Sequence, residues 1–292
     1  MAGLALAPQR TPIARRDREG RALTIAVTSG KGGVGKTTVT ANLATVFARL
    51  GHRTLVVDAD LGLAGLDVAL GLTPRFDLGD VLDGRARVED ALVTGPFGVT
   101  LLPAAPGRAE LAALGTTARA MLLALVDEIA RRFDVVLIDT GAGIGATVLD
   151  FAATADEVVL VVTPDPLALR DAYAMAKVLE RRSGRASVDV LTNHLTAGTD
   201  ELTVHRKLES LAGRFLGLEL RHAGAIRHDL AIAESCAHGV PLVLSEPSSS
   251  TARVLTSLAR ELDARRTEHP TTNELALAPT LSLVLPPRGA RP

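Results

Sequence analysis

The chain has 292 residues, of which 47% are hydrophobic, so it is long enough for one large α/β domain with a buried core or for two smaller ones. A formal net charge of −1 gives no global basic excess that would indicate nucleic-acid binding, and the single cysteine excludes an internal disulfide and any Cys-x-x-Cys site. The sequence has no basic and apolar leader and no run of 18 apolar residues, which predicts a protein that is neither secreted nor membrane-spanning.

Short apolar runs alternate with longer helical patterns, which favours βαβ units, a mostly parallel sheet and helices on both of its faces. The expected strands are residues 23–28, 53–58, 99–102, 135–139, 157–162, 188–193 and 218–221. The expected helices are residues 36–50, 116–132, 167–182, 201–215 and 251–265. We prefer a single domain over residues 21–265, between a flexible segment of residues 1–20 and a flexible Pro-rich tail of residues 266–292.

The most informative segment is residues 29–38, Ser-Gly-Lys-Gly-Gly-Val-Gly-Lys-Thr-Thr, which follows the first expected strand and opens the first expected helix. It fits the phosphate-loop pattern G-x-x-x-x-G-K-[ST], in which glycines let backbone N–H groups turn inward around phosphate oxygens. Lys36 is expected to reach the β and γ phosphates, and the Thr37 hydroxyl to bind Mg²⁺. The expected nucleotide contacts are Gly30, Lys31, Gly32, Gly33, Val34, Gly35, Lys36, Thr37 and Thr38.

Lys31 is a second cation in this loop. The chain has four lysines, at positions 31, 36, 177 and 207, among 32 lysines and arginines, so arginine is its default cation. Two of the four lysines lie in one loop, where a compact ammonium suits a phosphate oxygen better than a guanidinium fork does. This favours a role at phosphate over a merely solvated side chain.

Two further expected strands end in carboxylates. Asp58 and Asp60 follow the second strand, and Asp139 ends the fourth, before Gly141 and Gly143. Strand ends in an open α/β sheet meet at the crevice where ligands bind, so these carboxylates are expected to face the Mg-phosphate. Asp139 fits a Walker B position that accepts hydrogen bonds from Mg²⁺-bound water, and the glycines allow the following loop to move. Solvated turn aspartates and an ordinary loop are the alternatives.

The Lys-Gly-Gly-Val-Gly-Lys-Thr-Thr sequence resembles the deviant Walker ATPases of the MinD/ParA class, and with it the P-loop NTPase fold. The resemblance implies that Lys31 reaches the partner's nucleotide in an ATP-sandwiched homodimer, so that Lys31, Lys36 and Asp60 are catalytic. It implies that Asp60 orients the attacking water, while Thr37, Asp58 and Asp139 hold the Mg²⁺ shell. It also implies that Asn193, at a strand end, contacts adenine, with ATP and Mg²⁺ as cofactors.

Within that class the chain is similar to the FlhG group (also called YlxH or FleN), which controls flagellar number and placement. The similarity rests on Asp-Thr-Gly-Ala-Gly-Ile at residues 139–144 and Thr-Pro-Asp-Pro at residues 163–166. It implies a switch with slow ATP hydrolysis and, as partners, an FlhF-type GTPase, flagellar switch proteins or a flagellar transcription activator. The tail shows no basic amphipathic helix, because Pro279 interrupts its apolar stretch, so a cytoplasmic location is expected and peripheral contact with the inner membrane stays open.

Two alternatives from other classes are retained. A ParA-like protein would position DNA or cargo, and Arg181, Arg182 and Arg185 form one arginine cluster, although at a helix end such residues usually face solvent, so DNA is not expected as a partner. A metabolic P-loop transferase would keep the loop but would need an acceptor-substrate pocket and would not dimerise with nucleotide. The loop Arg227 to Asp229 is open between contact with the base and capping of the next helix.

Overall fold

The computed structural model describes residues 21–105, 107, 114–212 and 217–268. They form one eight-stranded sheet in the order β3-β4-β2-β5-β1-β6-β7-β8. All neighbouring pairs are parallel except β3 with β4. The strands are β1 (Leu23–Ser29), β2 (Thr54–Ala59), β3 (Val93–Thr94), β4 (Thr100–Leu102), β5 (Val135–Ala142), β6 (Glu157–Val162), β7 (Ser187–Leu195) and β8 (Glu219–Arg227).

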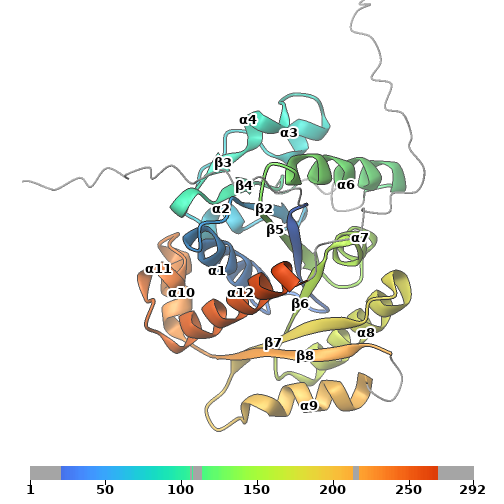
Figure 1. The fold of residues 1–292 in the computed structure, drawn as a ribbon, viewed down its shortest axis with the longest axis vertical. Helices are drawn as coiled ribbons and strands as arrows, with labels where there is room; N and C mark the ends of the chain where they lie inside the picture. The colour runs from blue at the N-terminus through green and yellow to red at the C-terminus, as the bar shows by residue number, and fades with distance from the viewer. Residues whose placement is uncertain (1–20, 106, 108–113, 213–216, 269–292) are drawn as a thin grey trace, which may run out of the picture.

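Helices cover both faces of the sheet, as the alternating sequence pattern predicts (Figure 1). The helices are α1 (Lys36–Arg49), α2 (Leu66–Ala69), α3 (Leu78–Leu82), α4 (Val88–Ala91), the 3₁₀ turn η1 (Pro96–Gly98), α6 (Thr116–Ala130), α7 (Ala146–Thr154), α8 (Pro166–Ser183), α9 (Glu201–Ala212), α10 (Leu230–Ala237), α11 (Leu242–Ser245) and α12 (Ser250–Glu268).

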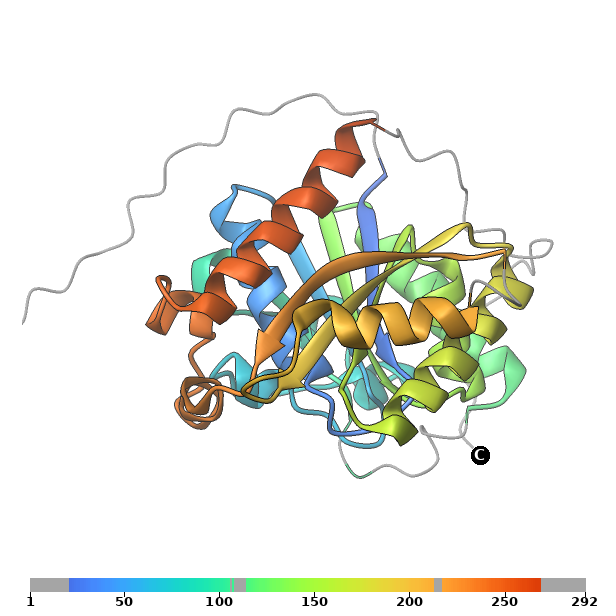
Figure 2. The same ribbon diagram turned by 90° about the horizontal axis from the view of Figure 1, so that it is seen from below.

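The core has two sides because side chains alternate along each strand. On β1, Ile25 and Val27 pack with α1, α2 and α12, whereas Ala26 packs with α7 and α8 on the opposite face. A third cluster under α3, α4 and α6 contains Leu55 and Val57 of β2. Figure 2 shows α12 and α9 on opposite sides of β8. Strands buried on both faces have near-continuous apolar sequences, which is why their positions could be predicted.

The structure confirms the predicted fold class, and all seven expected strands are present. The last strand runs to Arg227, which is further than the sequence predicted. It lies at the edge of the sheet, and its buried and exposed residues are mixed, so it lacks the continuous apolar sequence of the inner strands. The two-residue strand β3 and the short helices α2, α3, α4 and α11 were not predicted, nor was α7, whose Ala- and Thr-rich sequence has a weak helical period. Helix α10 was expected only as the next helix after Asp229.

The last helix extends past the C-terminal end of the predicted domain at residue 265. Helix α12 continues to Glu268, so residues 266–268 of the predicted tail form its last turn. The expected flexible segments over residues 1–20 and 269–292 lie outside the described residues. Among the helices that the structure describes, none combines the length and the apolarity needed to cross a membrane.

Candidate phosphate-binding site

The loop between β1 and α1 has the backbone that its glycines predict. Gly33 has φ +74° and Gly35 has φ +95°, the left-handed region that residues with a Cβ rarely adopt. Gly30 is needed for a different reason, since a Cβ there would lie 2.2 Å from the backbone C and O atoms of Asp171 in α8. The loop is therefore shaped by its own turns at one end and by close contact with α8 at the other.

Asn193 fixes this loop from the end of β7. Its side-chain amide donates to the Val34 carbonyl at 2.8 Å, and its side-chain oxygen accepts from the His194 amide at 2.9 Å. The side chain is only 4% exposed. The structure thus places Asn193 against the phosphate loop, where it holds the backbone, and its contact with adenine stays a prediction.

The carboxylates of β2 and β5 are neighbours. Asp58 and Asp139 are partners in the parallel register, and each is 1% exposed. The nearby Thr37 side chain and then the charge of Lys36, whose side chain is 6% exposed, act to lower the pKa of Asp139. The structure brings together the predicted lysine, hydroxyl and two carboxylates at the carboxyl ends of three adjacent strands.

Burial is the main force on the Asp58–Asp139 pair. It raises the pKa of Asp139 to about 7, with a further rise from the nearby charge of Asp58. It also raises the pKa of Asp58 to about 6, although the amides of Asp60, Gly65 and Leu66 donate to this carboxylate and oppose the rise. Two buried carboxylates of like charge side by side are stabilised by a cation between them.

One carboxylate oxygen of this pair, Asp139 Oδ2, is available to bind such a cation. Asp139 Oδ1 accepts a long hydrogen bond of 3.4 Å from Thr40, whereas Oδ2 is buried and has no hydrogen-bond partner among the described residues. Oxygen donors are what Mg²⁺ requires, and Thr37, Asp58 and Asp139 supply them. The residues present therefore fit a Mg²⁺ ion or its bound water.

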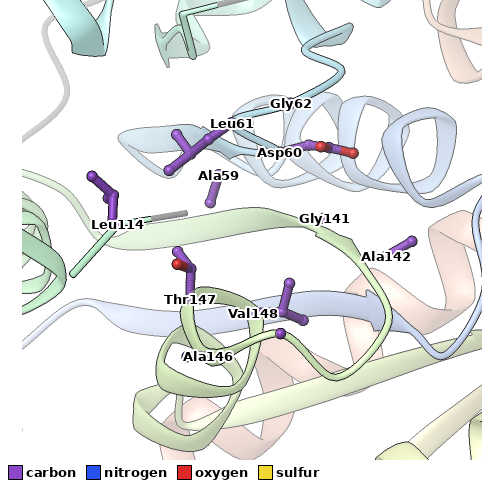
Figure 3. A pocket seen from close by; sticks show the side chains of 11 residues that line it. Ala59, Asp60, Leu61, Gly62, Leu114, Gly141, Ala142, Ala146, Thr147 and Val148 are labelled. Carbon is purple, nitrogen blue, oxygen red and sulfur yellow. The ribbon is translucent and has the colours of Figure 1, made fainter. Parts of the chain in front are cut away.

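Asp60 lies in a cleft between two loops (Figure 3). Its Oδ1 accepts from the Leu63 amide at 3.2 Å, and Gly141 near the end of β5 lies close by. In Figure 3 the carboxylate comes from the loop after β2, and the first turn of α7 lines the opposite side. The residues that line the cleft are Ala59, Asp60, Leu61, Gly62, Leu114, Gly141, Ala142, Gly145, Ala146, Thr147 and Val148. Asp60 is thus on the surface where a water molecule can approach.

The loop after β5 has the glycine that a mobile loop needs. Gly143, one of the two glycines noted after Asp139, has φ +82°, and its amide donates to the Ser29 carbonyl at 3.0 Å. This hydrogen bond joins the loop to the end of β1, where the phosphate loop begins. The two loops therefore share a direct backbone contact.

Lys31 makes an ion pair inside its own subunit. Its Nζ contacts Asp165 Oδ2, and Asp165 is the N-cap of α8, accepting from the Leu167 amide at 2.9 Å. Lys31 and Asp165 line one pocket with His194 and Thr196. The sequence pattern identified Lys31, but it gave no sign of Asp165 as its partner, because the two are far apart in the chain.

On the other side of Asn193 the loop after β8 approaches α1. Asp229 accepts from the Ala231 amide at 3.0 Å and caps α10, which fits the capping alternative for this loop. Cys236 of α10 lies 3.5 Å from the Thr38 hydroxyl, and the His194 and His228 rings are 6.2 Å apart. Sequence patterns could not find Cys236 or His194, since each is defined only by its place in the fold.

The arrangement matches known proteins over most of its length. A family model described as an AAA domain matches residues 22–187. The chain is 39% identical to the antiactivator FleN of Pseudomonas aeruginosa, over 82% of this chain and 86% of that protein. It is 35% identical to the flagellum site-determining protein YlxH of Helicobacter pylori, over 75% of this chain and 74% of that protein.

A solved structure has the same fold. The septum site-determining protein MinD of Pyrococcus horikoshii, complexed with Mg-ADP, matches with a TM-score of 0.68 and 28% identity, over 83% of this chain and 96% of that one. The family-model match over residues 22–187 includes the phosphate loop and the carboxylates Asp58, Asp60 and Asp139.

Proposed function

The chain belongs to the MinD/ParA family of deviant Walker ATPases and resembles its flagellar FlhG (FleN/YlxH) group. We propose that it is an ATP-driven dimerising switch that regulates flagellar assembly. The single observation that supports the chemistry best is the buried, unpartnered Oδ2 of Asp139 beside Asp58 and Thr37, at the mouth of the phosphate loop. An oxygen-lined position of this kind suits the Mg²⁺ of a Mg-nucleotide.

In this proposal the chain's residues divide the work of binding. Backbone N–H groups of residues 30–38 surround the phosphates, and Lys36 neutralises their charge from a buried position. Thr37, Asp58 and Asp139 hold Mg²⁺ and its water, and Mg²⁺ neutralises charge on the β and γ phosphates. Asn193 fixes Val34 and so keeps the loop open for the nucleotide, with contact to adenine as its second role.

The proposed hydrolysis step depends on Asp60 and Lys31. Asp60 accepts a hydrogen bond from the attacking water in the cleft between the loops after β2 and β5. Lys31 of each subunit approaches the phosphate bound by the other, so the site is complete only in a face-to-face dimer. Loss of the γ-phosphate frees the Gly143 loop, and the dimer reopens.

The flagellar role follows from the relatives. FleN is named an antiactivator and YlxH a flagellum site-determining protein, so regulation of a flagellar transcription activator, an FlhF-type GTPase or flagellar switch proteins is the proposed output. The ATP-bound dimer would present one surface to such a partner and the monomer would not. Deleting the gene should change the number or placement of flagella, and a Lys31→Ala copy should fail to restore them.

Direct nucleic-acid binding is not part of the proposal. Two of the three clustered arginines are already engaged, because Arg182 pairs with Asp150 of α7 and Arg185 donates to the carbonyls of Ala155 and Asp156. The proposed location is the cytoplasm. Peripheral contact with the inner membrane is the alternative location.

Sedimentation with ATP and with ADP tests the switch. We expect ATP to produce a dimer in the wild type, a more persistent dimer in Asp60→Ala and none in Lys31→Ala. ADP should leave all three proteins monomeric. A protein that stays monomeric with every nucleotide would contradict the proposal and favour a metabolic P-loop transferase.

A further inference from the structure

Lys31 and Asp165 form an ion pair in the isolated subunit, although the proposed function needs Lys31 at the partner's nucleotide. The two side chains line one pocket and come from the phosphate loop and from the residue that caps α8. Among the described residues, Asp165 is the carboxylate that pairs with Lys31. Lys31 is therefore committed inside its own subunit before any dimer forms.

The position of Asp165 is fixed by its backbone. Pro164 and Pro166 flank it, and each proline ring locks its own φ angle, so the carboxylate is held in place at little further entropic cost. Its Oδ1 accepts from the Leu167 amide while its Oδ2 faces Lys31, so the two oxygens have separate partners. Hydrogen bonds from Lys31 and from this amide hold the pKa of Asp165 below its usual range, which keeps it charged.

Helix α8 gives this carboxylate a particular importance for Lys31. Its 18 residues place a positive dipole end at Asp165, and an ammonium at that end would be repelled without a carboxylate between them. Asp165 therefore both caps the helix and makes it possible for Lys31 to rest there. If the carboxylate lost its charge, the helix end would push Lys31 away.

We propose that the Lys31–Asp165 ion pair is a latch, by which we mean a contact that holds Lys31 within the monomeric subunit. Dimerisation must break this contact in both subunits. The phosphate of the partner's nucleotide then competes with Asp165 for the same ammonium. This inference rests on the proposed ATP-dependent dimer, and it adds a residue that sets the ATP concentration at which the dimer forms.

The ion pair between Lys31 and Asp165 contributes little free energy, so a competing phosphate can break it. The side chains of Lys31 and Asp165 are 41% and 37% exposed, so solvent screens their attraction. Exposed pairs of this kind change an equilibrium by roughly 1.5- to 5-fold, and two latches are broken per dimer. We therefore expect removal of the latch to tighten the ATP dimer by about 2- to 25-fold.

Asp165→Asn is the variant that isolates the latch. Asparagine is as good an N-cap as aspartate, so its side-chain oxygen can still accept from the Leu167 amide while the charge that holds Lys31 is lost. Asp77→Asn is the matched control, because Asp77 caps α3 through the Asp80 amide and does not contact Lys31. Both variants keep a capped helix, and only one frees the lysine.

Two measurements on the full chain test the proposal. In sedimentation equilibrium with ATP, Asp165→Asn should dimerise at lower protein concentration than the wild type, and Asp77→Asn should match the wild type. In reductive methylation without nucleotide, read by peptide mass spectrometry, Lys31 should react faster in Asp165→Asn, with Lys177 and Lys207 as internal references. High salt should speed methylation of Lys31 in the wild type for the same reason.

The outcomes separate this inference from the proposed function. Equal methylation rates, or an Asp165→Asn dimer that is no tighter than the wild type, would overturn the latch. A weaker dimer would also overturn it, because it would mean that Asp165 positions Lys31 for the partner. A wild type that never dimerises with ATP would instead contradict the proposed function, while methylation would still report on the latch.

Discussion

Gly30→Ala should be strongly destabilising although Gly30 has no positive φ angle. A Cβ at this position would lie 2.2 Å from two backbone atoms of Asp171 and 2.7 Å from the Ala172 nitrogen. Ordinary contact begins near 3.4 Å, so the start of the loop or the backbone of α8 must move by more than about 1 Å. Overpacking usually costs 1–3 kcal/mol, and with backbone on both sides we expect about 3 kcal/mol or more.

Urea unfolding of the nucleotide-free protein, followed by circular dichroism, measures this cost. Gly32→Ala is the matched control in the same loop, since its Cβ would meet only the Ala142 Cβ at 3.8 Å. We expect its free energy of unfolding to change by less than about 0.5 kcal/mol. Gly33→Ala is a third case, with open space around the Cβ but φ +74°, so its cost should come from the backbone alone, about 1 kcal/mol.

The result that would refute this reasoning is equal stability of Gly30→Ala and Gly32→Ala. It would mean that α8 does not pack against the loop as closely as the structure has it. The position of Asp165 at the head of α8, and with it the contact to Lys31, would then need to be reconsidered.

Three further predictions follow from the site. Lys36→Ala should abolish ATP binding, measured by calorimetry, with little change in folding, because the phosphates lose their buried cation. Asn193→Ala should lower stability by roughly 1–3 kcal/mol and weaken ATP binding, because Val34 O and His194 N lose their partners. Asn42→Ala is the control for the loss of two similar bonds, one to the Thr38 carbonyl of α1 and one from the Val243 amide of α11. Without nucleotide and Mg²⁺, the free energy of unfolding should fall as pH rises from about 4 to about 8. The reason is that Asp58 and Asp139, with pKa values of about 6 and about 7 in the folded protein, hold protons over this range that the unfolded chain has already lost. Asp139→Asn should reduce this fall and raise stability at high pH by roughly 2–4 kcal/mol in urea unfolding, and a variant no more stable than the wild type would contradict the burial argument.

The phosphate loop and the buried strands were predictable because their signals are local. Residues 29–38 specify a turn, a lysine and a hydroxyl in one short run, and buried parallel strands are continuous apolar runs. The carboxylates Asp58 and Asp139 were predictable too, since parallel strands end at one edge of the sheet. Each of these features is encoded by residues that are close together in the sequence.

The features that could not be predicted depend on pairs of distant residues. Asp165 meets Lys31 across 134 positions, and Cys236 meets Thr38 across 198. The hydrogen bond from Asn193 to Val34 of the phosphate loop joins residues 159 positions apart. No spacing rule within one segment encodes such contacts, which are set by the packing of whole elements.

The most direct test of the central claim mixes two inactive proteins. Lys31→Ala and Asp60→Ala should each hydrolyse almost no ATP alone, because the first forms no dimer with itself and the second forms a dimer that lacks Asp60 at both sites. In a mixed dimer, the nucleotide on the Lys31→Ala subunit has its own Asp60 and receives Lys31 from the other subunit. The account predicts that ATPase activity appears on mixing and scales with the amount of mixed dimer. If the mixture stays inactive while mixed dimers form, Lys31 does not act across the interface and the account is contradicted.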